Sequence, residues 1–136
     1  MAAILEARGV CKYFGGLKAV DQVDMKVEEG MVYGIIGPSG AGKTTFFNLC
    51  SGTYPVTSGS IFFEGNEITG YTPEKVATLG MIRTFQNIKL FKYLSVLENV
   101  KAGCHIHTKT GFMDALLHTK QYKRDEEYCQ EQALKV

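Results

Sequence analysis

A glycine-rich stretch in the first third of the chain holds the residues whose types and spacing best suit chemistry. Its members are Gly37, Pro38, Ser39, Gly40, Ala41, Gly42, Lys43 and Thr44. They match the pattern G-x-x-x-x-G-K-[ST] at every fixed position. Glycines let backbone N–H groups curve around an anion, because no Cβ stands in the way. The stretch is therefore predicted to bind phosphate groups.

Three side chains in and beside this loop have specific expected roles. The Lys43 ammonium would bring a positive charge to the β- and γ-phosphates of a nucleotide, and the Thr44 hydroxyl would bind Mg²⁺. Thr45 follows directly and could reach the α-phosphate. A helix beginning at Lys43 would add free N–H groups and the positive end of its dipole. A nucleotide with Mg²⁺ is therefore expected, and Lys43 is a candidate catalytic residue.

The neighbouring sequence predicts the elements that must hold this loop. Residues 31–36, Met-Val-Tyr-Gly-Ile-Ile, form a nearly continuous apolar run, which is typical of a strand buried on both faces of a parallel sheet. Residues 43–50 predict a helix, and Gly52 suits its end. A strand, the loop and a helix in this order are the context that phosphate binding requires.

The rest of the sequence predicts a mixed α/β fold. Strands are expected at residues 5–14, 19–27, 60–64 and 81–86. One helix is expected at residues 72–79, where Pro73 stands in the first turn. Another is expected from Ser95, since Glu98 three residues later completes a capping box. From Lys101 onward the chain becomes polar and helix-prone.

Composition limits the class of protein. The 136 residues carry a net charge of +1 and are 45% hydrophobic, which argues against a nucleic-acid partner because such proteins usually carry a basic face. The sequence contains no secretory signal and no apolar run of about 18 residues. Residues 104–107, Cys-His-Ile-His, lack a second cluster with metal-ligand spacing, so we interpret them as part of a polar insert.

Three stretches resemble the ATPase subunits of ABC transporters. They are residues 12–21 with Lys-Tyr-Phe-Gly-Gly and Ala-Val-Asp, residues 49–61, and residues 82–100 with Arg-Thr-Phe-Gln-Asn and Ser-Val-Leu-Glu-Asn-Val. The resemblance covers essentially the whole chain. It is greatest to the group that imports branched-chain amino acids, because of the Arg-Thr-Phe-Gln string and the long polar insert after Val100.

The resemblance implies roles for three further residues. Phe14 falls where the family places an aromatic side chain that stacks on adenine, and Val20 falls among the nucleotide-binding residues. Gln86 falls on the family's Q-loop, where it would contact Mg²⁺ or the attacking water and lie near the membrane subunits. The implied cofactors are ATP and Mg²⁺, with Lys43 and Gln86 as catalytic residues.

The resemblance also implies a domain organisation and an assembly. Residues 1–93 would form the N-terminal half of the ATPase core, and residues 94–136 would begin a helical subdomain. Two ATPase subunits, as a homo- or heterodimer, would enclose ATP and drive membrane permease subunits through the Q-loop region. The protein would be cytoplasmic and peripheral to the membrane, at its cytoplasmic face.

Several parts of the family's catalytic machinery are absent from this sequence. It contains no signature motif, no apolar strand ending in Asp-Glu and no switch histidine. We therefore expect an ABC-type domain truncated before the signature and Walker B motifs, which binds nucleotide but hardly hydrolyses it. Residues 31–36 would then form an open strand edge.

Two other functions stay open from the sequence. One is a P-loop small-molecule kinase, since guanylate-kinase-like enzymes use a similar Gly-Pro-Ser-Gly string. Their loop lies very near the N-terminus, however, whereas two predicted strands come first here. The other is a fragment that binds nucleotide without catalysis.

Overall fold

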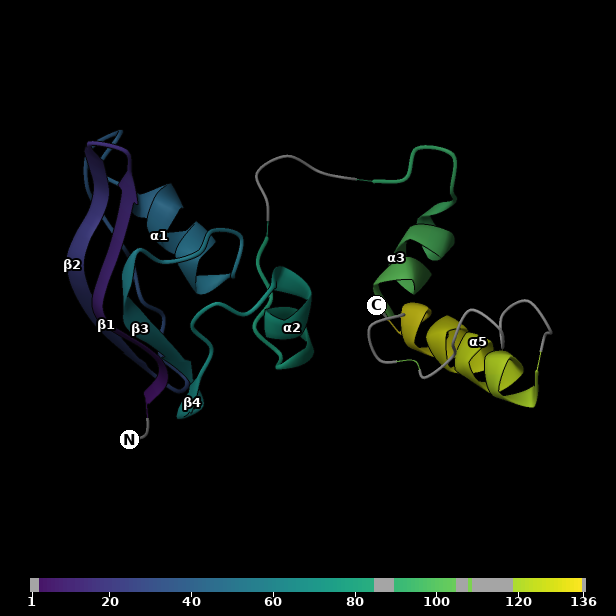
Figure 1. Ribbon diagram of the computed structural model, residues 1–136. Helices are drawn as coiled ribbons and strands as arrows, with labels where there is room; N and C mark the ends of the chain where they lie inside the picture. Colours follow the sequence, from purple (N-terminus) through teal and green to yellow (C-terminus); the bar gives the residue numbers. More distant parts are fainter. Residues whose placement is uncertain (1–2, 85–89, 105–107, 109–118, 136) are drawn as a thin grey trace. The chain divides into compact units, whose positions relative to one another are not determined.

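Residues 3–84, 90–104, 108 and 119–135 are described by the computed structural model (Figure 1). The chain divides into two compact units, Met1–Arg83 and Thr84–Val136. The first unit contains the phosphate loop. The boundary predicted at residue 93 stays a prediction.

An antiparallel sheet forms the frame of the first unit. Two long strands, β1 (Ala3–Phe14) and β2 (Leu17–Glu28), pair as a hairpin. Two shorter strands, β3 (Ser58–Phe63) and β4 (Asn66–Glu67), extend it in the order β2-β1-β3-β4. The strands predicted at residues 5–14, 19–27 and 60–64 are confirmed.

Two helices lie on the same side of this sheet, α1 (Lys43–Cys50) and α2 (Pro73–Thr78) (Figure 1). Apolar side chains from the strands, both helices and the segment after β4 meet in one core. Its buried members are Ala7, Val10, Val20, Phe46, Leu49, Cys50, Ile61, Phe63, Ile68 and Val76. Because their burial favours close packing of α1 on the sheet, the core fixes the helix that begins at the phosphate loop. Both helices confirm the predictions for this unit.

Two predicted strands are wrong. Residues 31–36 form no strand, and Val32 and Ile36 are 103% and 95% exposed instead of buried. Residues 81–84 form no strand either, and residues 85–86 lie outside the described part of the chain. A strand needs a neighbour that takes up its backbone N–H and C=O groups. No described strand pairs with either segment, so apolar character alone does not produce β-structure there.

The second unit contains the helices α3 (Val96–Cys104) and α5 (Lys120–Ala133), which pack against each other. The predicted capping box is confirmed. The Ser95 N–H donates to Glu98 Oε2 at 2.7 Å, and the Glu98 N–H donates to the Ser95 hydroxyl at 3.3 Å. Lys101 on α3 forms an ion pair with Glu126 on α5. None of the helices that the structure describes is long and apolar enough to span a bilayer.

Candidate nucleotide-binding site

The phosphate loop joins residues 31–36 to the start of α1. The Lys43 ammonium donates to the carbonyl oxygens of Gly37 and Pro38, at 2.7 Å each. The Ala41 N–H donates to the Pro38 carbonyl at 3.3 Å and closes a turn within the loop. These bonds hold the positive charge of Lys43 at the loop, where an anion would meet it.

Gly42 has the strictest steric requirement in the loop. Its φ is +83°, and a Cβ added there would lie 2.2 Å from the Ala19 carbonyl oxygen and 3.6 Å from Val20 Cγ2. Any side chain at this position would therefore push the start of α1 away from β2. The close approach requires glycine, and it places Val20, which is buried, directly beside the loop.

The start of α1 offers backbone donors to a ligand. Gly42 is the N-cap and provides no side-chain acceptor, while the first intrahelical bond runs from the Phe46 N–H to the Gly42 carbonyl at 2.8 Å. N–H groups in the first helical turn have no partner within a helix, and the helix dipole makes this end positive. Thr44 is exposed here, and its hydroxyl is an oxygen ligand of the kind that Mg²⁺ accepts. The donor set fits a Mg-nucleotide.

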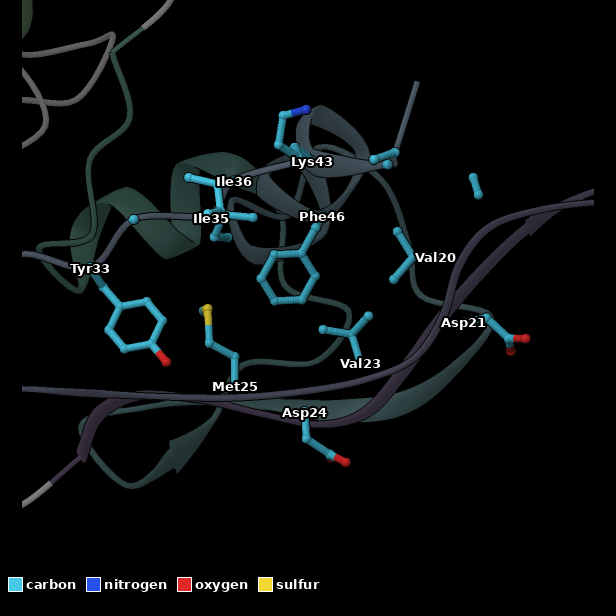
Figure 2. A pocket seen from close by; sticks show the side chains of 14 residues that line it. Val20, Asp21, Val23, Asp24, Met25, Tyr33, Ile35, Ile36, Lys43 and Phe46 are labelled. Carbon is cyan, nitrogen blue, oxygen red and sulfur yellow. The ribbon is translucent and has the colours of Figure 1, made fainter. Parts of the chain in front are cut away.

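A cavity of about 580 Å³ lies next to the loop, lined by β2, residues 33–36 and the start of α1. Figure 2 shows Val23, Met25 and Phe46 gathered in it, while the Lys43 ammonium points away from these apolar side chains. An apolar interior does not suit a triphosphate, since burying unpaired charge is costly. The groups that suit phosphate better lie at the rim, in the loop and at the start of α1.

Phe14, at the end of β1, is 45% exposed, but other side chains contact its ring. Its ring meets the ring of Tyr54 edge to face, with centroids 5.7 Å apart and an interplanar angle of 83°. Lys12 Nζ lies 5.1 Å from the centre of the Phe14 ring and donates to the Pro55 carbonyl at 2.7 Å. An exposed ring of this kind can stack on a nucleobase.

The charges near Phe14 form a separate cluster on the hairpin. The Tyr13 hydroxyl donates to Asp21 Oδ1 at 2.5 Å, and Lys18 forms an ion pair with Asp21 at 3.0 Å. The bond from Tyr13, and then the bond from Lys18, lower the pKa of Asp21, while the bond to Asp21 raises the pKa of Tyr13. Because these side chains bond to one another, we infer that they stabilise the hairpin and do not bind the ligand.

The first unit holds most of the residues predicted for the site. Phe14 lies two residues beyond Lys12, which pairs with Val20 across the hairpin, and Val20 lines the same cavity as Gly42 and Lys43. Gln86 lies outside the described residues. Neither Lys12 nor Tyr54 was predicted from the sequence as a site residue, and both contact the Phe14 ring. Lys12 could have been found, because alternate residues of a strand share a face, whereas nothing in the sequence indicated Tyr54.

The chain is similar to known proteins over most of its length. The family model described as ABC transporter matches residues 20–135. The high-affinity branched-chain amino acid transport ATP-binding protein BraF of Pseudomonas aeruginosa is 45% identical over 130 residues, which are 96% of this chain and 51% of BraF. A probable branched-chain amino acid transport ATP-binding protein LivG of Archaeoglobus fulgidus is 37% identical over 135 residues, 98% of this chain and 51% of LivG. The chain thus spans about half the length of the curated relatives it matches.

Two solved structures have the same architecture over this length. The crystal structure of a nucleotide-free ATP-binding cassette from an ABC transporter matches with a TM-score of 0.73 at 35% identity, covering 95% of this chain and 51% of that one. A cassette crystallised in its ADP conformation matches with a TM-score of 0.71 at 36% identity, covering 88% and 47%. These similarities confirm the fold class predicted from the sequence.

Proposed function

The chain belongs to the ABC transporter family, and from this premise we propose that it is the ATP-binding part of an importer's ATPase subunit. The complete subunit would couple ATP binding and hydrolysis to the uptake of a solute. Branched-chain amino acids are the proposed solute class, since BraF and LivG are named for their transport. Family membership favours this function over the small-molecule kinase considered from the sequence.

The observation that carries the proposal is the packing of the phosphate loop on β2. Gly42 brings the first turn of α1 against Ala19, at a distance that only glycine permits. The same turn carries Lys43, whose ammonium is held at the loop by two carbonyl bonds of 2.7 Å. Backbone donors, a helix N-terminus and a lysine therefore converge on one position, as binding of a polyphosphate requires.

Each part of the site has a proposed role toward Mg-ATP. The backbone N–H groups of residues 39–45 would enclose the phosphates, with Lys43 at the β- and γ-phosphates and Thr45 at the α-phosphate. The Thr44 hydroxyl would bind Mg²⁺. Phe14 would stack on adenine, with Val20 beside the nucleotide. Gln86 would contact Mg²⁺ or the attacking water.

The proposed assembly follows from the family. A second ATPase subunit would complete the nucleotide site, and membrane permease subunits would bind near the Q-loop. The chain would then lie at the cytoplasmic face of the membrane without entering it. Residues 31–36 expose several apolar side chains, and we propose that the remainder of such a subunit covers them with neighbouring strands.

The 136-residue chain is proposed to bind nucleotide but to turn it over negligibly. Phosphoryl transfer depends on positioning and electrostatic stabilisation of the transferring group. The sequence lacks a signature motif and a strand ending in Asp-Glu, which would supply part of both. Activity therefore belongs to the complete assembly.

Calorimetric titration with Mg-ATP, alongside a phosphate-release assay, tests this function. Wild type should bind, Lys43→Ala should lose most of the affinity, and Lys26→Ala, on β2, should bind like wild type. Turnover at the rate of an ordinary ATPase, about 1 per second or faster, would contradict the proposal that this chain binds nucleotide with negligible turnover. Absence of binding in folded wild type would contradict the site itself.

A further inference from the structure

The segment that follows α1 attaches the phosphate-loop helix to the end of β1. We define this segment, residues 54–57, as the strap. Its Thr57 accepts at Oγ1 from the Tyr13 N–H at 3.0 Å and donates its own N–H to the Cys11 carbonyl at 2.8 Å. The strap thus holds the strand that ends in Phe14 through two bonds to its backbone.

The strap also holds the side chains around Phe14. Pro55 accepts at its carbonyl from Lys12 Nζ at 2.7 Å, and the same ammonium lies 5.1 Å from the centre of the Phe14 ring. Tyr54 contacts that ring edge to face at 5.7 Å. Edge-to-face pairs and cations over rings are both attractive arrangements, so the Phe14 ring is oriented although 45% of the residue is exposed.

The strap is itself fixed to α1. The Tyr54 N–H donates to the Asn48 carbonyl at 3.1 Å, directly after the end of α1, where the Ser51 and Gly52 N–H groups donate to the Phe47 and Leu49 carbonyls at 3.0 and 3.1 Å. The other end of α1 is held against the hairpin at Gly42 and Ala19. One short helix therefore connects with the β1–β2 hairpin at both of its ends.

We propose that Lys12 and Tyr54 are positioning residues for the nucleobase. They hold the Phe14 ring in the orientation that stacks on adenine, and the strap fixes this ring relative to the phosphate loop. The base then meets a ring that is already ordered, and less conformational freedom is lost on binding. The inference rests on the proposed function, because it needs a nucleotide whose phosphates occupy the loop.

The test separates contacts to the base from contacts to the phosphates. Mg-ATP and Mg-tripolyphosphate are titrated calorimetrically into wild type, Tyr54→Leu, Tyr54→Phe, Lys12→Met and Lys12→Arg. Lys75→Met is the matched control, since Lys75 lies over the Tyr71 ring at 3.7 Å and belongs to α2. Tripolyphosphate lacks a base, so its binding also reports whether each variant keeps a folded loop.

The expected result is a loss confined to the nucleotide. Tyr54→Leu and Lys12→Met should weaken Mg-ATP binding by about three- to tenfold, as expected for partial loss of one base–aromatic stack, and should change tripolyphosphate binding less than about twofold. Tyr54→Phe and Lys12→Arg keep the ring and the charge and should bind like wild type. In a Phe14→Ala background, neither substitution should weaken binding further.

Four results would overturn the inference. Equal weakening of both ligands would show that the two residues only stabilise the fold, and unchanged affinity for both would show no role. Additive losses in the Phe14→Ala background would show that the residues act independently of the ring. If wild type binds neither ligand, the proposed function fails and the inference fails with it, which is distinct from a loss restricted to Mg-ATP.

Discussion

Replacing Gly42 by alanine tests whether the phosphate loop depends on close packing against β2. Alanine would have to adopt a φ of +83°, which costs an L-residue about 1–2 kcal/mol. Its Cβ would also lie 2.2 Å from the Ala19 carbonyl oxygen, far inside the ordinary contact range of 3.4–4 Å. Relief requires α1 or β2 to move, and overpacking of this kind costs about 1–3 kcal/mol. The free energy of unfolding should therefore fall by about 2–5 kcal/mol, less a gain of up to about 1 kcal/mol from the unfolded state.

Gly40→Ala is the matched control for this substitution. Gly40 has nearly the same φ, +84°, but an added Cβ would meet nothing within 4 Å, so it carries the backbone cost without the clash. Urea unfolding followed by circular dichroism should show a clearly lower midpoint for Gly42→Ala than for Gly40→Ala. Mg-ATP binding measured on Gly42→Ala below its unfolding transition should also be weaker than in wild type. Equal midpoints for the two variants would refute the argument that the contact with Ala19 holds the loop.

Three further predictions concern single groups. Burial raises the pKa of the Cys50 thiol from 9.0 to about 11, so the stability that the neutral thiol gives the fold is complete below pH 9 and lost as pH rises through 11. Urea midpoints should therefore fall more steeply over this pH range in wild type than in Cys50→Ala. Hydrogen bonds from Ser95 lower the pKa of Glu98 from 4.5, so the cap of α3 is present above pH 4.5 and weakens as pH falls through the pKa of the folded state. Circular dichroism should show a loss of α3 helicity in acid, and Glu98→Gln should reduce this loss. The Asn99 amide donates to the carbonyls of Phe91, Leu94 and Ser95 at 3.0–3.2 Å; Asn99→Asp removes these donors and should speed hydrogen exchange at residues 91–95 by about tenfold, whereas Asn66→Asp should leave it unchanged.

The sequence predicts best those features that depend on neighbouring residues. The hydrogen bonds of the capping box at Ser95 and Glu98 join residues three positions apart, so the pattern alone identifies them. Alternation likewise predicts the strand at residues 19–27, and a mixture of apolar and polar residues predicts the strand at residues 5–14, with which it pairs. The phosphate loop belongs to the same class, because its glycines, lysine and helix start are contiguous.

Features that depend on distant partners are predicted poorly. The apolar run at residues 31–36 has the composition of a buried strand, but a ladder needs a second strand and no described strand supplies one. The contact between the Tyr54 and Phe14 rings joins residues that lie 40 positions apart in the sequence. No local sequence pattern encodes such a contact. The requirement for glycine at position 42 is visible in the motif, whereas its physical reason, the Ala19 carbonyl, comes only from the packing of α1 on β2.

The most direct test of the central claim is an amide spectrum of the chain, recorded by ¹⁵N–¹H NMR during titration with Mg-ATP. The claim is that backbone N–H groups of the loop and of the first turn of α1 hold the phosphates. Signals of residues 39–45 should shift in wild type, signals of β3 and β4 should stay unchanged, and Lys43→Ala should abolish most of the shifts. Loop signals that stay in place at saturating Mg-ATP, or that shift equally in Lys43→Ala, would contradict it.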